Sequence, residues 1–94
     1  ARILDVTLAD QNLRRVLTRW ADESGWIFRP EHWTPDVDIA VSARASFSSD
    51  FKRSVRALLA GTELSSRPLQ PCFYANQVLR VVPQAERCDR RVAH

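Results

Sequence analysis

Residues 37–61, VDIAVSARASFSSDFKRSVRALLAG, change their hydrophobic period from two to 3.6 near Ser48 and Ser49. Alternation through residues 37–47 predicts a long extended strand with one apolar face. The two serines can accept hydrogen bonds from the first N–H groups of a helix, and Gly61 lies where a left-handed cap would end that helix. The apolar stripe of this second element consists of Phe51, Val55, Leu58 and Leu59. A strand and a helix that are each apolar on one side need similar elements to pack against.

The first 25 residues supply a second strand and helix of the same kind. Residues 2–7 alternate and predict a strand, and Asp10 is placed to cap the helix that follows. Gly25 is expected to end this helix, and Arg19 and Glu23 are spaced for an i,i+4 ion pair. Its core stripe consists of Leu13, Val16, Leu17, Trp20 and Ala21.

The rest of the chain predicts one more short strand, a loop and a hairpin. Residues 26–28 are apolar and extended, whereas the prolines in residues 29–36 favour a loop. The runs at 69–74 and 77–82 predict two antiparallel strands, with Asn76 taking the positive φ of the turn. The proline at position 71 confines its strand to a sheet edge or a bulge.

The predicted order is therefore β-α-β-β-α-β-β in one domain over residues 1–82, followed by a polar tail over residues 83–94. The chain has 94 residues, 45% of them hydrophobic, and a formal net charge of +3. No apolar run approaches the roughly 20 residues of a membrane span. There is no signal-peptide pattern and no methionine, so we expect any targeting segment to lie upstream of Ala1.

The sequence offers no recognisable catalytic or metal site. His32 and His94 are the only histidines, and neither accompanies a Gly-x-Ser-x-Gly elbow. Two histidines and two cysteines at scattered spacing form no known ligand set, and two glycines cannot build a phosphate-binding loop. We interpret the chain as a non-enzyme without cofactor or metal.

Nucleic-acid binding is the other class to weigh, because βαββαβ is also the order of the RNA-recognition fold. That fold stacks bases on aromatic side chains of its central strands, and residues 3–6 and 37–41 contain none. The chain also lacks the Gly-x-x-Gly loop of KH domains. The basic residues of the two helices are interpreted as solvated faces, and nucleic acid is not an expected partner.

Tryptophans and cysteines leave some alternatives open. Trp20 and Trp26 are expected in the core, whereas Trp33, in a proline-flanked polar loop, is either a lid on the core or an exposed interaction anchor. Cys72 and Cys88 fit either two free thiols or one disulfide.

Three blocks of sequence together resemble a known family. The blocks are Leu13-x-x-Val16-Leu17-x-x-Trp20-Ala21-x-x-x-Gly25-Trp26, then Ala45-Ser46-Phe47-x-x-Asp50-Phe51-x-x-x-Val55-x-x-Leu58, then Tyr74-x-Asn76-x-Val78-Leu79-Arg80-Val81. Over residues 3–82 the chain resembles the C-terminal domain of toxin co-regulated pilus biosynthesis protein Q, a family that includes PilL-type lipoproteins of type IVb and conjugative pili. That family is similar in turn to the secretin and TonB short N-terminal domain.

The resemblance implies an α+β fold in which two helices lie between a two-stranded and a three-stranded sheet. It further implies a periplasmic location, with outer-membrane association through an upstream segment. The expected function is a non-catalytic interaction module of a type IVb pilus, conjugation or secretion complex. It would dock on a secretin or an outer-membrane core subunit, and a homo-oligomeric ring in the assembled machine is also expected. An oxidising periplasm would favour a disulfide between Cys72 and Cys88, which would pin the tail across the closing hairpin.

We expect docking by strand addition at an open sheet edge, with residues 3–7 and the Pro71-containing strand as the candidate edges. The expected partner-binding residues are Trp33 as the anchor, with Asp5, Arg14, Arg15 and Arg19. Two alternatives remain. One is a signalling input domain of a TonB-dependent transducer that binds an anti-sigma regulator. The other, less favoured, is a nucleic-acid-binding module.

Overall fold

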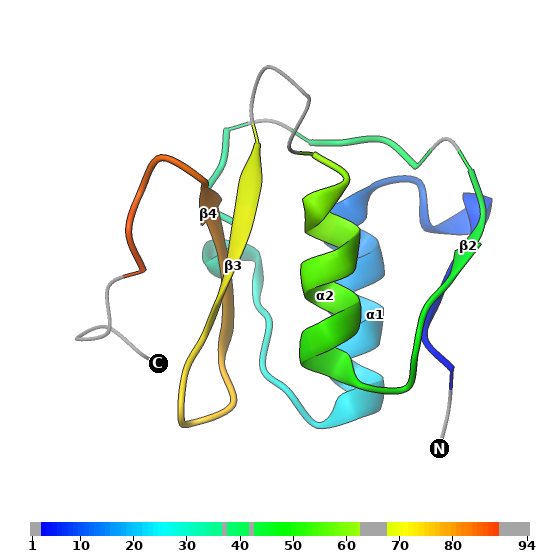
Figure 1. The fold of residues 1–94 in the computed structure, drawn as a ribbon, viewed down its shortest axis with the longest axis horizontal. Coiled ribbons are helices and arrows are strands. Elements are labelled where there is room, and N and C mark those ends of the chain that lie inside the picture. Colours follow the sequence, from blue (N-terminus) through cyan, green and yellow to red (C-terminus); the bar gives the residue numbers. More distant parts are fainter. Residues whose placement is uncertain (1–2, 37, 42, 63–67, 89–94) are drawn as a thin grey trace.

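A computed structural model describes residues 3–36, 38–41, 43–62 and 68–88 of the chain. Its elements are β1 (Asp5–Val6), the 3₁₀ helix η1 (Leu8–Asp10), α1 (Leu13–Ser24), the 3₁₀ helix η2 (Pro30–His32), β2 (Ala45–Ser46), α2 (Phe51–Ala60), β3 (Leu69–Phe73) and β4 (Leu79–Pro83). Strands β1 and β2 form one antiparallel sheet and β3 and β4 another. Figure 1 shows both helices between these sheets, with α1 behind α2. No helix in the described part of the chain is long and apolar enough to cross a membrane.

Helix α1 forms where the sequence predicted it, but its cap lies two residues later. All five residues of the expected core stripe are buried, and Gly25 ends the helix at φ 75° in the left-handed region. The N-cap is Asn12, whose side chain accepts from the Arg15 N–H at 2.9 Å. Asp10 instead ends η1, which was not anticipated, and its carboxylate accepts from the Thr7 N–H at 2.9 Å.

Helix α2 also begins later and ends differently from the expectation. Its N-cap is Asp50, whose side chain accepts from the Arg53 N–H at 3.1 Å. Before the helix begins, Ser48 Oγ accepts from the Asp50 N–H. Gly61 has φ −63°, so the predicted left-handed cap is wrong. The buried Thr62 instead caps the C-terminal end of the helix, because its hydroxyl donates to the Leu59 carbonyl at 2.6 Å.

The long strand predicted over residues 37–47 is wrong, because only β2 is regular. The chain before β2 contacts the α1 entrance instead, where the Leu13 N–H donates to the Ile39 carbonyl and the Val41 N–H to the Gln11 carbonyl, each at 2.8 Å. Ile39, Val41 and Phe47 still pack partly buried against the core, so the predicted apolar face exists without the strand. Positions 37 and 42 lie outside the described residues.

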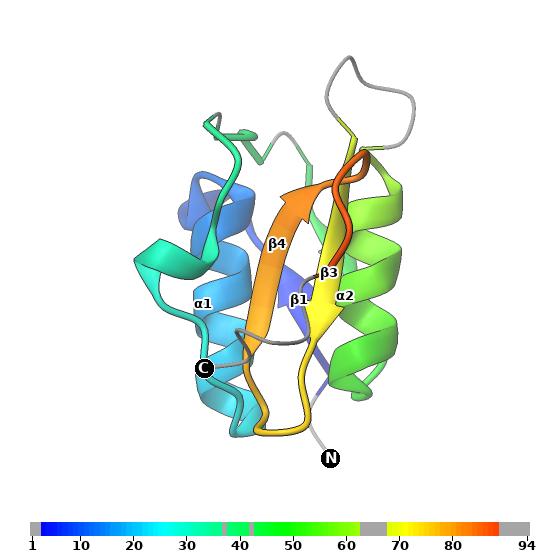
Figure 2. The same cartoon turned by 90° about the vertical axis from the view of Figure 1, so that its left-hand side faces the viewer.

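The closing hairpin is confirmed, with β3 and β4 paired from Leu69↔Pro83 to Phe73↔Leu79. Gln77 takes the positive φ of 63°, so the expectation for Asn76 is wrong. The short strand expected at 26–28 is reduced to one bridge, Ile27↔Val78, and a second parallel bridge joins Trp33 to Val81. The described residues therefore show two two-stranded sheets, and the implied three-stranded sheet is not found. In Figure 2 the hairpin faces the viewer, with β4 on the side of α1 and β3 next to α2.

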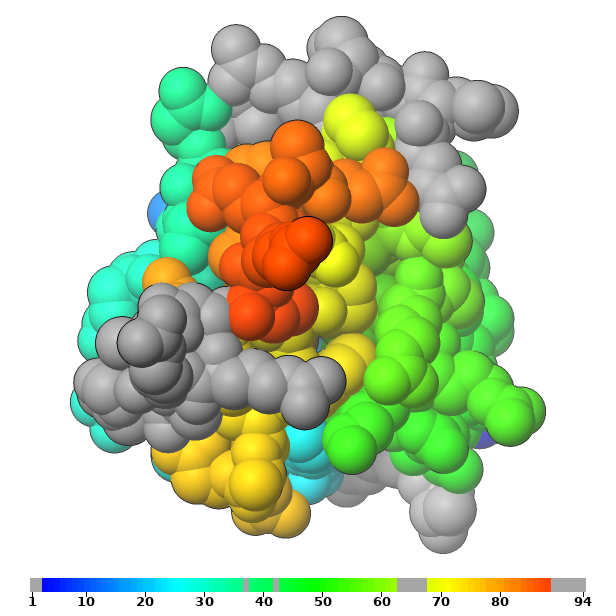
Figure 3. Space-filling view, turned by 60° about the vertical axis from the view of Figure 1, so that its left-hand side comes forward, coloured from blue at the N-terminus to red at the C-terminus, as the bar shows by residue number. Residues whose placement is uncertain are grey.

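The segment after β4 is not a free tail over its described part. Pro83 belongs to β4, and the residues up to position 88 turn back over the outer face of the hairpin (Figure 3). Cys88 is bonded there to Cys72 by a disulfide. Beneath it lies a second buried cluster of Cys72, Tyr74, Val78 and Val82. The last six positions of the expected tail lie outside the described residues.

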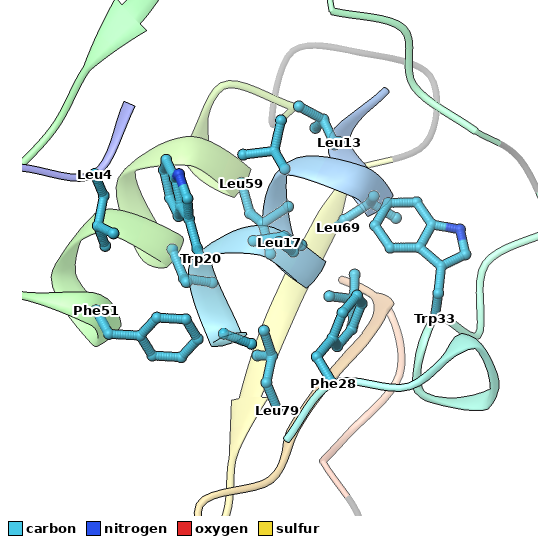
Figure 4. Close-up of a cluster of buried hydrophobic side chains, with 14 of the residues drawn as sticks. Leu4, Leu13, Leu17, Trp20, Phe28, Trp33, Phe51, Leu59, Leu69 and Leu79 are labelled. Carbon is cyan, nitrogen blue, oxygen red and sulfur yellow. The ribbon is translucent and has the colours of Figure 1, made fainter. Parts of the chain in front are cut away.

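The main core is shared by both helices and the inner face of the hairpin. Val16, Leu17 and Trp20 of α1 have no exposed surface, and Val55 and Leu59 of α2 have none either. Figure 4 shows Leu17, Trp20 and Leu59 of the helices gathered with Leu69 and Leu79 of the hairpin, and the Trp33 indole lies at one side of the cluster. Trp26 was expected in the core, but it is only half-buried and lies at the core's edge, where it stacks on Phe51 with ring centroids 5.1 Å apart.

Trp33 keeps 8% of its surface exposed, so we expect its removal to open the core. Trp33→Ala should lower the free energy of unfolding by about 3 kcal/mol, the range for a large buried aromatic residue. Urea unfolding followed by circular dichroism measures this loss. Leu8→Ala is the control, because Leu8 is 52% exposed and should cost less than about 0.5 kcal/mol. Losses of similar size in the two variants would contradict the burial of Trp33.

Candidate functional site: the edges of the two sheets

The guanidinium of Arg19 ties α1 to β1 and to η1. It donates to both carboxylate oxygens of Asp10, from Nε at 3.1 Å and from Nη2 at 2.8 Å. It also donates to the Asp5 carboxylate at 3.2 Å and to the Asp5 carbonyl at 2.7 Å. The predicted pair with Glu23 is present, at the longer distance of 3.8 Å. Arg19 and Asp5 were expected to bind a partner, but the structure uses both for contacts within the chain.

Asp10 carries the strongest of these contacts and is the more buried partner. Its side chain is 11% exposed, against 32% for Arg19. The hydrogen bonds from Arg19 lower the pKa of Asp10 below its ordinary 3.8, more than desolvation raises it, and bonds from Thr7 act in the same direction. The pairing with Asp10 also raises the pKa of Arg19. Both groups therefore remain charged at neutral pH, and the pair is bidentate.

The outer edge of β1 is closed by this arrangement. The Phe47 N–H donates to the Leu4 carbonyl at 2.7 Å, so the next pair, Asp5 and Ser46, turns its backbone groups outward. The outward carbonyl of Asp5 accepts from the Trp20 indole N–H at 2.8 Å as well as from Arg19. Residues 3–7 were a candidate docking edge, and α1 and η1 cover it.

The outer edge of β3 is interrupted. The Tyr74 N–H donates toward β4 at 3.0 Å, so alternation turns the groups of Leu69, Pro71 and Phe73 outward. The Leu69 N–H is taken by Thr62 Oγ1 at 2.9 Å, and Pro71 has no N–H. Pro71 therefore does lie on an edge strand, but Phe73 offers the single outward N–H in β3 without a partner among the described residues.

The outer edge of β4 is occupied by the segment around η2. The Ile27 N–H donates to the Gln77 carbonyl at 2.8 Å, and the Leu79 N–H donates back to Ile27 at 2.9 Å. Further along, the N–H and the hydroxyl of Thr34 both donate to the Val81 carbonyl, at 3.0 and 2.9 Å. A partner strand cannot pair here without displacing this segment.

The outer edge of β2 remains open. The register with β1 points the backbone N–H and C=O groups of Ser46 and Arg44 away from β1. These groups have no hydrogen-bond partner among the described residues. Residues 43–46 are all exposed. A shallow groove is lined by residues of β1, η1 and β2, and the exposed Leu8 lines it together with Arg44 and Ser46. The structure thus places an unpaired edge next to an apolar side chain.

The remaining expected contact residues do not form one surface. Trp33 is buried, and an anchor must offer surface to a partner, so we withdraw that assignment. Arg14 pairs with Asp38 at 3.3 Å, and both side chains are exposed, so the pair contributes little to stability. Arg15 is exposed and its N–H is used in the α1 cap. The side chains of Arg14 and Arg19 are therefore paired with different carboxylates of the chain itself.

Sequence reasoning did not single out Arg44, Ser46 or Phe73, which lie at unpaired edge positions, although Phe73 belongs to the expected Pro71-containing edge strand. Small residues such as Ala45 and Ser46 are a weak indication of an exposed strand, because they bury little apolar surface. For Phe73 the available signal was Pro71 two positions earlier. No group of three or more metal-ligating side chains occurs among the described residues.

A family model described as toxin co-regulated pilus biosynthesis protein Q matches residues 2–84. No curated protein and no solved structure matches the chain. The matched range contains both sheets, both helices and the Arg19 contacts, and it ends just after β4.

The Arg19 contacts predict a specific acid response. The pKa of Asp10 is lower in the folded chain than in the unfolded chain. Its contribution to the free energy of unfolding is therefore complete above the unfolded pKa of 3.8, and it is lost as the pH falls through the lower folded pKa. Asp10→Asn should therefore reduce the free energy of unfolding by about 1–3 kcal/mol at pH 7, and the difference from wild type should shrink below about pH 4. Urea unfolding between pH 2.5 and 7 measures this.

Asp38→Asn is the matched control, since Asp38 makes an exposed pair and should change stability by less than about 1 kcal/mol. A loss in Asp10→Asn that stayed constant down to pH 2.5 would show that the carboxylate charge is not the source of the stabilisation.

Proposed function

The chain belongs to the toxin co-regulated pilus biosynthesis protein Q family, and from this we propose that it is a non-catalytic interaction module that docks a partner strand on the β2 edge. The family implies a role in pilus biosynthesis. The single observation that supports docking at β2 is the open edge at Arg44 and Ser46, since the other strand edges are covered, occupied or interrupted. Strand addition uses backbone hydrogen bonds for affinity and alternate side chains for selectivity.

The geometry specifies what a docking strand would meet. Outward N–H and carbonyl groups of Arg44 and Ser46 can pair with an extended backbone, and alternate partner side chains would fall toward the groove at Leu8. The Arg44 side chain favours an acidic residue at a neighbouring position. Two-residue pairing alone is weak, so the groove contact at Leu8 would supply part of the affinity.

The proposed partner is a secretin or an outer-membrane core subunit, and the proposed compartment is the periplasm. The disulfide between Cys72 and Cys88 supports an oxidising compartment, because disulfides persist there and are rare in the cytosol.

Site-specific photo-crosslinking in pilus-assembling cells tests this proposal. A crosslinker at Arg44 should yield one discrete adduct with an envelope subunit, and mass spectrometry should identify a secretin or a core subunit. The control position is Asp22, which is exposed in the last turn of α1 and should give no adduct. Equal labelling from both positions, or no adduct from Arg44 in cells with assembled pili, would contradict docking at β2.

A further inference from the structure

A second surface, independent of the β2 edge, lies between α2 and β3. We call it the α2–β3 groove; its lining includes Lys52 and Arg56 of α2 together with Pro71 and Phe73 of β3. Figure 3 shows α2 and β3 next to each other on this face of the molecule. The disulfide also borders the groove, since Cys72 and Cys88 line it.

The charge of the α2–β3 groove has one sign. Lys52 and Arg56 line it, and none of its lining residues in the described chain is acidic. Both side chains are exposed. In the described residues neither makes an ion pair, and a carboxylate could approach both without displacing an existing partner.

Aromatic rings lie beside both cations. The Arg56 guanidinium lies 5.0 Å from the centroid of the Phe73 ring, and Lys52 Nζ lies 5.9 Å from the same centroid. Lys52 Nζ also lies 5.7 Å from the Trp26 ring. Cation–π contacts of this kind restrict long basic side chains before any ligand arrives, so less conformational entropy is lost on binding.

The same residue that orients the cations also offers a backbone donor. Phe73 N–H points outward from β3 and has no hydrogen-bond partner among the described residues. Pro71, two residues before it, prevents a long strand from pairing along this edge. The groove therefore suits a short extended segment that makes one backbone hydrogen bond and presents a carboxylate to the two cations.

We propose that the α2–β3 groove binds a short, extended, acidic peptide segment of a partner protein. In this arrangement a main-chain carbonyl of the peptide accepts from the Phe73 N–H, and an Asp or Glu side chain of the peptide contacts Lys52 and Arg56. Single-stranded nucleic acid fits less well, because it binds by stacking bases on exposed aromatic faces. Here Phe73 and Trp26 are half-buried and lie under the cations.

Backbone NMR of the whole chain tests the proposal with a defined probe. The probe is an acetylated and amidated hexapeptide of alternating valine and glutamate, and its control replaces each glutamate with lysine. The glutamate peptide should shift the Phe73 amide and the amides of Lys52 and Arg56 in a saturable way. The lysine peptide should leave them unchanged.

Two arginines of α2 give a matched pair of variants. Arg56→Glu should weaken binding of the glutamate peptide about 10-fold, as expected for replacing an attractive contact with a repulsive one. Arg53→Glu makes the same charge change three residues earlier, outside the α2–β3 groove, and should alter the Kd by less than about 2-fold. Circular dichroism spectra of both variants check that α2 is intact, and Arg56→Gln provides a milder second variant.

Several outcomes would overturn the proposal. One is the absence of any shift of the Phe73 amide at about 5 mM glutamate peptide, a concentration at which a complex with a Kd of about 1 mM is mostly formed. Another is an equal response to the lysine peptide. Tighter binding of a thymidine dodecamer at the same residues would assign the groove to nucleic acid. Shifts confined to Arg44 and Ser46 would reject the groove and leave the proposed β2 docking intact.

Discussion

The backbone carbonyl of Asp5 is held by two side chains of α1, and this contact fixes one sheet to the helical layer. Trp20 contributes an indole N–H at 2.8 Å and Arg19 a guanidinium N–H at 2.7 Å. The indole belongs to the core, whereas the guanidinium continues to Asp10 at the end of η1. Because one carbonyl joins the apolar core to a charged cluster, β1 is anchored although it is only two residues long.

Closing the β1 edge decides which surfaces are left for partners. The sheet has two edges, so covering the β1 side with α1 leaves the β2 side, where residues 43–46 are exposed. In the other sheet, the segment around η2 pairs with the outer edge of β4. The outer edge of β3 is interrupted by Thr62, which accepts from one of its N–H groups, and by Pro71, which has no N–H. Exposed strand edges are aggregation hazards that proteins usually block, and the unblocked β2 edge is the one at which we propose docking.

The sequence predicted the helices and the hairpin well because their signals are local. Large apolar residues at a period of 3.6 define both helix stripes, and Pro71 indicated an edge strand. The long strand failed because alternation specifies the faces of a segment but not the length of its pairing partner, and β1 offers two residues. Asp10 was wrongly expected to cap α1. A carboxylate can either cap a helix or pair with Arg19, and only tertiary contacts decide between these two roles. Trp33 packs into the core next to its backbone bridge with Val81, a long-range contact that local sequence does not encode.

Amide hydrogen exchange of the free chain, followed residue by residue by NMR, tests the central claim that β1 is closed and β2 is open. Thr7 and Ala45 should exchange slowly, because the first donates to Asp10 and the second faces β1. Arg44 and Ser46 should exchange at rates close to those of an unstructured chain. Slow exchange at Arg44 and Ser46, or fast exchange at Thr7, would contradict this assignment of the open edge.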